Sequence, residues 1–516
     1  MGSARKTAYY QDTPELQEAR ANWVAKDYRR SLRLFERAAK RDPYNLMALK
    51  DAAYAFGQHF EIQTATKYIK RMTSLAGNDP GALHVISDAW RDASRPKEAM
   101  TALHKAVDSG NARPETYLCI ALAQERSHKL DEALESLERF LKMQPGAAEG
   151  LRLKALLLRR LGNIDQAKDI YRSMHDYCGS GNQLILAQAL NEWANVLDLE
   201  GDYDAAFDKI QQSKKILQKS PEAPGLLARE YQERVWFDQF IDSLTPDNME
   251  NWAGRSERTD SNVILTGCPR SGTTLIEKVL DAHSEIISAE ELGVFSTYIV
   301  PRLFNQISED DFDGASLDSL PGNMLRREAQ NYRRYMEAAI DEKLGGRVLI
   351  DKVPSSTMVI PFMLRLLPGT HVLYALRDPR DIVVSCFMCW MQQNTVSTCF
   401  YNLEETVKRT VCELRWWSKL KELLPGDRWY ETRYEDTVKD VTRESQRILG
   451  WLDLPWEDGV NQYREHLQER GVISPTYESV NKPVYQRAVG RWKNYEKHLQ
   501  PYLANLEETA EVLGYS

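Results

Sequence analysis

The chain has 516 residues, which exceeds the size of one ordinary folding domain, so we expect two or more domains. Hydrophobic residues make up 42% and charged residues 28%, an ordinary balance for a water-soluble globular protein. The sequence contains no run of about 18 apolar residues, so we predict no transmembrane segment. The net charge of −8 argues against a nucleic-acid-binding protein and against a polybasic membrane-surface protein.

The cysteines indicate a reducing compartment. The chain has seven, an odd number scattered along its length, so we expect reduced thiols and a cytoplasmic location. Residues 1–19 also lack the apolar centre of a signal peptide. Cys386 and Cys389 form one CxxC pair, but a zinc site would need a tighter second pair than Cys399 and Cys412 provide. We therefore interpret these cysteines as apolar thiols on a buried helix.

Residues 1–215 contain an internal repeat with a period of 34 residues. In each copy a small residue is followed four positions later by a large apolar residue and preceded twelve positions earlier by another small one. The three columns are Ser31, Ala65, Ala99, Ala133 and Ala167; Phe35, Ile69, Leu103, Leu137 and Tyr171; and Ala19, Ala53, Ser87, Ala121 and Ala155. A sixth copy, slipped by five residues, contains Ala194, Ala206 and Ile210. This pattern resembles the tetratricopeptide repeat (TPR), in which stacked helix pairs form an α-superhelix.

A superhelix of this kind has a concave groove, and we expect the groove to bind an extended peptide or a partner protein. The alternatives are that the repeats act only as a spacer or as a dimerisation arm. A dimerisation arm would make the protein a homodimer. Residues 216–260 continue the helical pattern without a clear phase, so we interpret them as a helical linker that ends in a polar loop.

The stretch Val263–Leu275, VILTGCPRSGTTL, predicts a buried strand, a glycine-containing turn and a helix. This geometry directs backbone N–H groups and a helix N-terminus at a phosphate. Gly267 and Gly272 fit the spacing of the nucleotide-binding pattern GxxxxGK[ST], but Thr273 stands in the place of the lysine. Arg270 supplies a planar cation within the turn instead. The bound anion is therefore not expected to be a nucleoside triphosphate, although such turns also occur without any ligand.

The segment CPRSGTTL resembles the 5′-phosphosulfate loop of the sulfotransferases, which use 3′-phosphoadenosine 5′-phosphosulfate (PAPS). The likeness is greatest to the tyrosylprotein sulfotransferases, which share PRSGTTL at 269–275, LDAH at 280–283 and the paired Glu290 and Glu291. It covers about half of the chain, from residue 262 onward. It implies a P-loop-like α/β domain with a central, mainly parallel sheet. The residues that would hold the 5′-phosphosulfate are Arg270, Ser271, Gly272, Thr273 and Thr274.

Two further positions carry the predicted chemistry. Sulfuryl transfer to a hydroxyl needs a general base that accepts the proton of the hydroxyl. In the tyrosylprotein sulfotransferases the second glutamate of the pair is this base, and it aligns with Glu291. Glu290 stays open as the alternative, and either carboxylate could simply mark a helix start. Lys352 ends a predicted strand at Val348–Ile350, where side chains of an open α/β sheet face the ligand crevice. The resemblance implies that Lys352 stabilises charge on the oxygen that bridges sulfur and phosphorus.

A second anion site is predicted around the strand His371–Leu376. Arg377 ends this strand and Ser385 lies on the following helix, a pair that suits a phosphate monoester. The resemblance assigns Arg377 and Ser385 to the 3′-phosphate, and Arg491 of the closing segment adds a third ligand, which is the second cation. Tyr434 either contacts the adenine or is simply a core residue.

These observations predict a multidomain α and α/β protein: repeats at 1–215, a helical linker at 216–260 and a sulfotransferase domain at 261–516. The expected reaction moves a sulfuryl group from PAPS to an acceptor hydroxyl without a metal, and the favoured acceptor is a peptide tyrosine presented by the repeats. A glycan or small-metabolite acceptor is the alternative, since VGRW at 489–492 is nearer the VGxW of small-molecule sulfotransferases. A TPR adaptor with an inactive nucleotide-binding domain and a P-loop kinase are the remaining alternatives.

Overall fold

The computed structural model describes residues 9–25, 27–254, 262–304, 307, 313–465 and 486–515. The chain divides into two compact units, Met1–Leu161 with Arg334–Glu342, and Gly162–Arg333 with Lys343–Ser516. The domain division predicted from the sequence stays a prediction.

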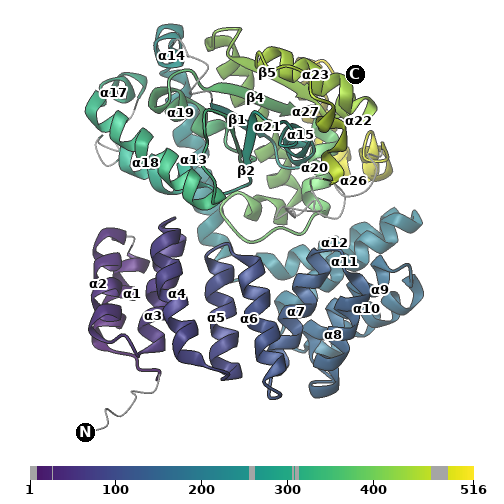
Figure 1. Cartoon of the computed structure of the whole chain (residues 1–516). Helices are drawn as coiled ribbons and strands as arrows, with labels where there is room; N and C mark the ends of the chain where they lie inside the picture. The colour runs from purple at the N-terminus through teal and green to yellow at the C-terminus, as the bar shows by residue number, and fades with distance from the viewer. Residues whose placement is uncertain are drawn as a thin grey trace. The chain divides into compact units, whose positions relative to one another are not determined.

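The first unit is built from helix pairs (Figure 1). Its helices are α1 (Pro14–Val24), α2 (Tyr28–Arg41), α3 (Leu46–Gln58), α4 (Ile62–Ala76), α5 (Pro80–Asp92), α6 (Pro96–Asp108), α7 (Pro114–Arg126), α8 (Leu130–Met143) and α9 (Ala148–Arg160). Successive starts of α3, α5, α7 and α9 are 34 residues apart, and so are those of α2, α4, α6 and α8. The period predicted from the sequence is therefore the period of the helix pairs.

The repeated small residues lie where two helices of a pair touch. Ala65 and Ala133 are fully buried, and the hydroxyl of Ser31 in α2 donates a hydrogen bond to the carbonyl of Ala19 in α1 (2.8 Å). The large apolar residues that follow, such as Ile69 and Leu137, are also fully buried. Close helix contact at small residues and filling by large ones explain why the chain repeats these two columns.

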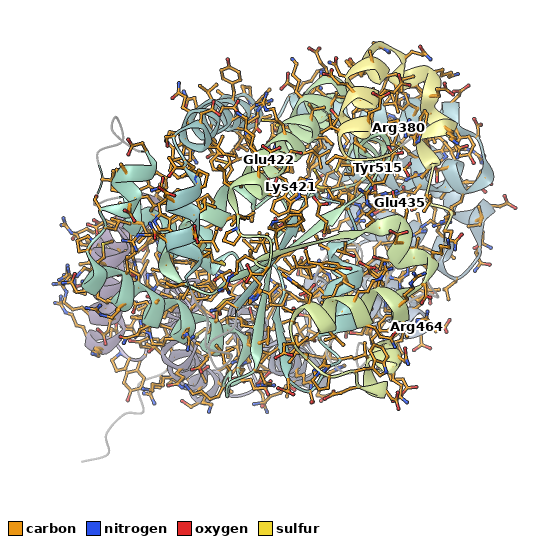
Figure 2. All side chains as sticks on the ribbon, turned by 90° about the horizontal axis from the view of Figure 1, so that it is seen from above. Arg380, Lys421, Glu422, Glu435, Arg464 and Tyr515 are labelled. Atoms are coloured by element: carbon orange, nitrogen blue, oxygen red, sulfur yellow. The ribbon has the colours of Figure 1, made fainter. Side chains whose placement is uncertain are left out.

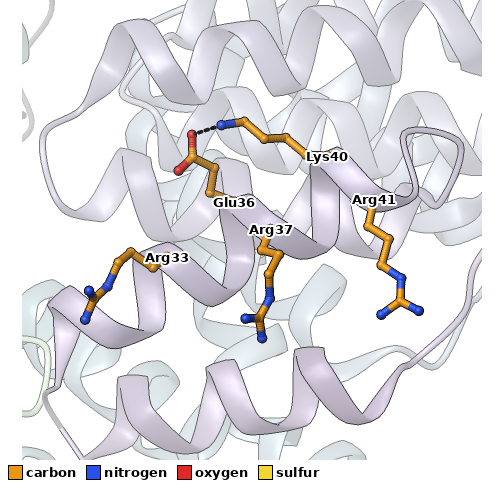
Figure 3. A pocket seen from close by; sticks show the side chains of 5 residues that line it. All are labelled: Arg33, Glu36, Arg37, Lys40 and Arg41. Carbon is orange, nitrogen blue, oxygen red and sulfur yellow. Dashed lines mark hydrogen bonds and ion pairs between the residues drawn. The ribbon is translucent and has the colours of Figure 1, made fainter.

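The exposed side of α2 is basic, which is a local exception in a chain with net charge −8. Arg33, Glu36, Arg37, Lys40 and Arg41 line a shallow hollow there (Figure 3). Lys40 pairs with Glu36 (2.6 Å), so this surface is partly neutralised within the helix itself.

The second unit begins with five helices. They are α10 (Ile164–Cys178), α11 (Gln183–Glu200), α12 (Tyr203–Gln218), α13 (Ala223–Asp242) and α14 (Pro246–Ala253). The slipped sixth repeat corresponds to α11 and α12, in which Ala194 and Ala206 are fully buried. Among the helices of the described ranges, none combines the length and apolar character needed to cross a bilayer.

A five-stranded parallel sheet forms the centre of the second unit (Figure 1). Its order is β2 (Ile286–Ala289), β3 (Val348–Lys352), β1 (Asn262–Gly267), β4 (His371–Leu376) and β5 (Trp429–Arg433). Every residue of β1, β2 and β3 is buried, as expected for a parallel sheet covered on both faces. The carboxyl ends of all five strands lie at one edge, and the loops that carry the predicted site follow from them.

The other described elements after residue 262 are helices and short helical turns, and the end of α18 belongs to the first unit. The helices are α15 (Thr273–Leu280), α16 (Val300–Phe304), α17 (Gly314–Asp318), α18 (Gly322–Ile340), α19 (Ile360–Leu366), α20 (Pro379–Met388), α21 (Leu403–Leu423), α22 (Tyr434–Lys439), α23 (Val441–Trp451), α26 (Glu496–Leu499) and α27 (Leu503–Val512). The short turns are η2 (Phe295–Ile299), η4 (Thr357–Val359), η5 (Ser397–Tyr401), η6 (Asp458–Gln462), η7 (Arg491–Tyr495) and η8 (Gln500–Tyr502). The predicted fold class, helical repeats followed by a parallel α/β domain, is confirmed.

Candidate active site

The loop between β1 and α15 lies at the carboxyl edge of the sheet. Gly267 has a φ of +139°, and a Cβ there would stand 2.3 Å from the carbonyl oxygen of Ala375. Gly272 has a φ of +100°, and its Cβ would stand 2.7 Å from the ring of Tyr434. Both positions therefore require glycine, because any side chain would collide with a neighbouring strand or ring. Gly272 is also the N-cap of α15 and supplies no side-chain cap.

Arg270 adopts an unusual backbone conformation within this loop. Its φ of +70° lies in the left-handed region, which residues with a Cβ adopt at a cost of about 1–3 kcal/mol. Its side chain is held at Ser385 of α20, because Arg270 Nε donates to Ser385 Oγ (3.2 Å). The strained backbone thus places a guanidinium beside a hydroxyl that comes from a different element.

Lys352, Glu291 and Thr274 form a continuous set on one side of the loop. Lys352 ends β3 and is fully buried, and its Nζ donates to Glu291 Oε1 (2.7 Å) and lies 3.5 Å from Thr274 Oγ1. Glu291 is the most accessible of the three, with 36% of its side chain exposed. A carboxylate, an ammonium group and a loop hydroxyl therefore meet beside the predicted anion-binding turn.

The paired glutamates face different lysines. Glu290 follows β2 and pairs with Lys278 of α15, whereas Glu291 pairs with Lys352. Only 17% of the Glu290 side chain and 4% of the Lys278 side chain are exposed, so this pair is largely enclosed. Of the two carboxylates left open by the sequence, Glu291 has the better access for an acceptor molecule.

Glu277 of α15 supports Lys352 from inside the protein. Its fully buried carboxylate stands 3.3 Å from Lys352 Nζ and accepts a hydrogen bond from the hydroxyl of Ser288. Burial alone would lower the pKa of Lys352, but the carboxylates of Glu277 and Glu291 outweigh it and raise that pKa above its ordinary value. Lys352 is therefore held as a cation although its own side chain is fully buried.

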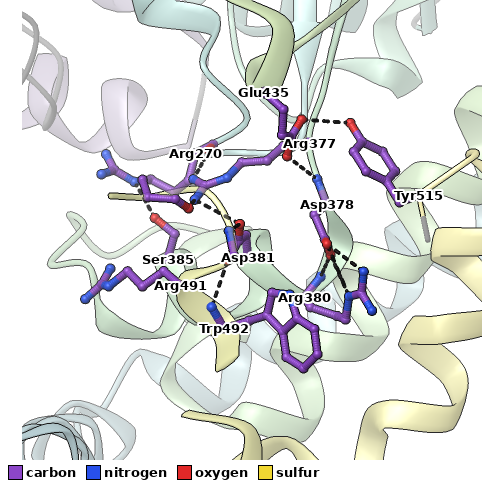
Figure 4. Close-up of polar contacts among 12 residues, drawn as sticks. Arg270, Arg377, Asp378, Arg380, Asp381, Ser385, Glu435, Arg491, Trp492 and Tyr515 are labelled. Atoms are coloured by element: carbon purple, nitrogen blue, oxygen red, sulfur yellow. Dashed lines mark hydrogen bonds and ion pairs between the residues drawn. The ribbon is translucent and has the colours of Figure 1, made fainter. Parts of the chain in front are cut away.

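Arg377 and Arg270 meet on the other side of the loop (Figure 4). Arg377 follows β4, and its Nη1 donates to the carbonyl oxygen of Arg270 (2.9 Å). Its guanidinium also lies over the ring of Tyr434, with 4.6 Å from the central carbon to the ring centroid. Arg270, Arg377 and Ser385 thus form a single cluster, which we call the arginine cluster.

Asp381 of α20 fixes the closing segment against the arginine cluster (Figure 4). Its two carboxylate oxygens accept from the backbone N–H of Gly490 (2.7 Å) and of Trp492 (2.8 Å). Arg377 also donates to the carbonyl of Ala488, on the same segment. Arg491 lies between the two anchored N–H groups, and its own guanidinium donates to Asp198 of α11 (2.8 Å).

The start of α22 is tied to the end of β4. The backbone N–H of Asp378 donates to Glu435 (3.1 Å), and the hydroxyl of Tyr515 donates to the other oxygen of that carboxylate (3.2 Å; Figures 2 and 4). Tyr434, the neighbour of Glu435, is half-buried and packs against Gly272 of the loop. Its ring therefore supports the loop.

Among the described residues, the buried polar atoms without a hydrogen-bond partner include one in the loop and one in the arginine cluster. These two are the hydroxyl of Ser271, which is 1% exposed, and Nε of Arg377. A buried polar group without a hydrogen bond costs about 1–3 kcal/mol, so such groups are uncommon in folded proteins. An anionic ligand would satisfy both atoms, and the residues present therefore fit the phosphorylated nucleotide that the sequence predicts.

Several residues of this site were not found from the sequence. Glu277, Lys278 and Asp381 read as ordinary helix residues, and Asp198 lies 293 residues from its partner Arg491. The signal that could have marked Glu277 is its place on the apolar face of the helix TTLIEKVL, where a lone carboxylate needs a buried partner. In the part of the chain that the structure describes, no group of three His, Cys, Asp or Glu side chains could hold a metal ion.

The second unit thus has a parallel α/β sheet with an arginine-bearing loop and a carboxylate–lysine pair at its carboxyl edge, the edge at which open α/β sheets bind ligands. Residues 262–458 match the model of the sulfotransferase family. The C-terminal half of the chain therefore contains a sulfotransferase-family domain.

Several relatives are similar to this chain at low identity. A protein of Aquifex aeolicus described as uncharacterized is 24% identical over 452 residues, covering 78% of this chain and 56% of the relative. Protein-tyrosine sulfotransferase A of Caenorhabditis elegans is 24% identical over 249 residues, covering 46% of this chain and 62% of the relative. The protein-tyrosine sulfotransferase of Drosophila melanogaster is 25% identical over 293 residues, with coverages of 53% and 54%. The chain thus spans little more than half the length of these relatives.

Two solved structures show weaker likeness. The sulfotransferase domain from the curacin biosynthetic pathway aligns with a TM-score of 0.36 at 18% identity, over 49% of this chain and 97% of that one. The type IV pilus biogenesis factor PilW aligns with a TM-score of 0.33 at 19% identity, over 40% of this chain and 94% of that one.

Proposed function

We propose that this protein transfers a sulfuryl group from PAPS to an acceptor hydroxyl, and that the acceptor is a tyrosine of a peptide. The observation that carries the proposal is the contact of Lys352 with both Glu291 (2.7 Å) and the loop hydroxyl of Thr274 (3.5 Å). A proton acceptor, a cation and an anion-binding turn are the three parts that group transfer to a hydroxyl needs, and they are contiguous here.

The nucleotide contacts follow from the two sides of the loop. The 5′-phosphosulfate is held by Arg270, Ser271, Gly272, Thr273 and Thr274. The 3′-phosphate is held by Arg377, Ser385 and Arg491, and Tyr434 contacts the adenine. The partnerless Ser271 hydroxyl and Arg377 Nε support this assignment, because each would gain its missing hydrogen bond from a phosphate oxygen.

Bound PAPS supplies an electrophilic sulfur and a phosphate leaving group. Glu291 accepts the proton of the acceptor hydroxyl as that oxygen bonds to sulfur. Lys352 donates a hydrogen bond to the bridging oxygen as its bond to sulfur breaks, and so stabilises the charge left on the 5′-phosphate. The sulfated acceptor and 3′-phosphoadenosine 5′-phosphate (PAP) are the products, and Glu291 then releases the proton that it accepted to solvent.

The tyrosine acceptor rests on the relatives that are named protein-tyrosine sulfotransferases. In this proposal the repeats at 1–215 present the peptide, residues 216–260 link them to the transferase domain at 261–516, and the protein acts in the cytoplasm. A glycan or small-metabolite hydroxyl is the second candidate, which the VGRW sequence at 489–492 favours.

Calorimetry with PAP and a transfer assay with labelled PAPS test the proposal. The transfer assay should compare a tyrosine peptide, the same peptide with phenylalanine and a polysaccharide. We expect label on the tyrosine peptide alone, and loss of PAP binding in Arg270→Ala. Arg447→Ala is the matched control, because Arg447 is half exposed on α23 and pairs only at 3.6 Å with Glu444. Transfer to the polysaccharide alone would move the assignment to the second candidate, and no PAP binding by the wild type would refute the function.

A further inference from the structure

We propose that Asp198, on helix α11 of the sixth repeat, positions Arg491 for the 3′-phosphate and so makes this repeat part of the nucleotide site. The proposal rests on the proposed function, since it takes Arg491 as a phosphate ligand. Asp198 precedes the transferase domain in sequence, so nothing in the motifs of that domain points to it.

The contact between the two side chains is close and mostly enclosed. Asp198 Oδ1 accepts from Arg491 Nη2 (2.8 Å) and Nε (3.3 Å), and the side chains are 18% and 21% exposed. The hydroxyl of Tyr495 donates to the same oxygen. Because Asp198 engages the Nε and Nη2 edge, the Nη1 end of the guanidinium remains for a phosphate oxygen.

The backbone around Arg491 is fixed toward the arginine cluster. Asp381 accepts from the N–H groups of Gly490 and Trp492, on either side of Arg491, and its carboxylate lies 3.7 Å from Arg377. With the backbone held by Asp381, the direction of the Arg491 side chain depends on its own partner. A long arginine side chain loses rotamer entropy when it is ordered, and the contact with Asp198 orders Arg491 before the nucleotide binds.

The packing around Asp198 is that of a single core. One hydrophobic cluster contains residues of α11, α12, α20 and the closing segment. Its buried members include Ala194, Phe207, Val383, Phe387 and Trp492. Asn191 of α11 also donates to the carbonyl of Met388 at the end of α20 (3.0 Å). Helix α11 therefore packs directly against α20, the helix that carries Ser385, as a positioning role requires.

Asp204 offers a matched control from the neighbouring helix. Its carboxylate accepts from Lys497 and His498, which follow the same closing segment, but its side chain is 64% exposed. This pair joins the same two regions of the chain without contacting Arg491. Its loss should remove only a solvent-exposed surface ion pair and leave PAP binding unchanged.

The test is calorimetry on the full chain with two probes, PAP and adenosine 5′-monophosphate, which lacks the 3′-phosphate. We expect Asp198→Ala to weaken PAP about tenfold, in line with one charge-assisted hydrogen bond, and to leave the monophosphate unchanged. Asp198→Asn keeps an acceptor oxygen, so its loss of PAP affinity should be smaller. Asp204→Ala should bind PAP with the affinity of the wild type. In an Arg491→Ala background, Asp198→Ala should have no further effect on PAP.

Each other outcome has a definite meaning. Equal losses for PAP and the monophosphate in Asp198→Ala would make the contact merely structural, and tighter PAP binding would show that Asp198 competes with the phosphate. Either result overturns the inference, and Asp198→Asn repeats the comparison if the alanine variant fails to fold. Wild-type protein that binds PAP no better than the monophosphate would instead refute the 3′-phosphate site and, with it, the proposed function.

Discussion

Replacing Glu291 with glutamine separates catalysis from stability in this protein. Glu291 is 36% exposed, and its partner Lys352 keeps a second carboxylate, Glu277, at 3.3 Å. Loss of the Glu291 charge therefore leaves no buried ammonium unpaired. We expect a change in the free energy of unfolding below about 1 kcal/mol, because the lost interaction is that of a partly exposed ion pair.

The effect on transfer should be far larger. A general base contributes roughly 10²- to 10⁴-fold to a rate, so Glu291→Gln should lose about that factor in single-turnover transfer from labelled PAPS. Affinity for PAP should stay within about twofold, since the variant keeps Lys352, Thr274 and the arginine cluster. A thermal melt, calorimetry with PAP and the single-turnover rate together measure the three quantities.

Glu290→Gln is the matched control, because it changes the same group one residue away. Glu290 pairs with Lys278, whose side chain is 4% exposed, so its loss should cost about 1–3 kcal/mol of stability. Its transfer rate should stay within about tenfold of the wild type. The reasoning fails if Glu291→Gln transfers at the wild-type rate, or if Glu290→Gln is the variant that loses transfer at normal stability.

Three further predictions concern buried groups near the loop. Ser271→Ala removes a hydroxyl that lacks a partner, so it should raise the thermal midpoint of the free protein slightly and weaken PAP about tenfold in calorimetry. Glu277→Gln removes a carboxylate that raises the pKa of Lys352, so the alkaline limb of the pH profile of kcat/KM should move to lower pH. Burial raises the pKa of Asp351 from 3.8 to about 6, so ionisation of this residue destabilises the folded state increasingly as pH rises through that range. Asp351→Asn can still accept the hydrogen bond from Tyr332, so between pH 4 and pH 7 its free energy of unfolding should rise by about 3 kcal/mol relative to that of the wild type. Denaturant titrations at several pH values measure this difference, and a difference that does not change with pH would contradict the prediction.

The parts of the fold that could be predicted are those that the chain encodes locally. The small residues at 65, 99 and 133 recur at the period of the helix pairs because each pair needs the same close contact. The strand, turn and helix around Gly267 and Gly272 followed from the apolar run and from glycines that the backbone requires. The residues that form such a signal lie close together in the sequence or recur at a fixed period. They can therefore be recognised without knowledge of the tertiary contacts.

The residues that were missed act across long stretches of sequence. The role of Glu277 depends on its contact with Lys352, which lies on β3. The role of Asp198 likewise depends on its contact with Arg491. No periodicity or motif links such pairs, because their proximity depends on the strand order and on how α11 packs. The roles predicted for Glu291, Lys352 and the nucleotide ligands stay predictions, and the structure adds partners to them.

In the proposed function, Lys352 compensates for Thr273, which stands where nucleotide-binding loops carry a lysine. In the parallel pairing of β1 with β3, Leu265 stands opposite Lys352, so the side chain of Lys352 emerges beside the turn that follows β1. Its Nζ reaches to 3.5 Å from the hydroxyl of Thr274, the residue next to Thr273. In the proposed function, Lys352 of the neighbouring strand therefore adds a second cation to Arg270, which lies within the loop itself. On this strand the ammonium group of Lys352 also contacts two carboxylates, those of Glu277 (3.3 Å) and Glu291 (2.7 Å).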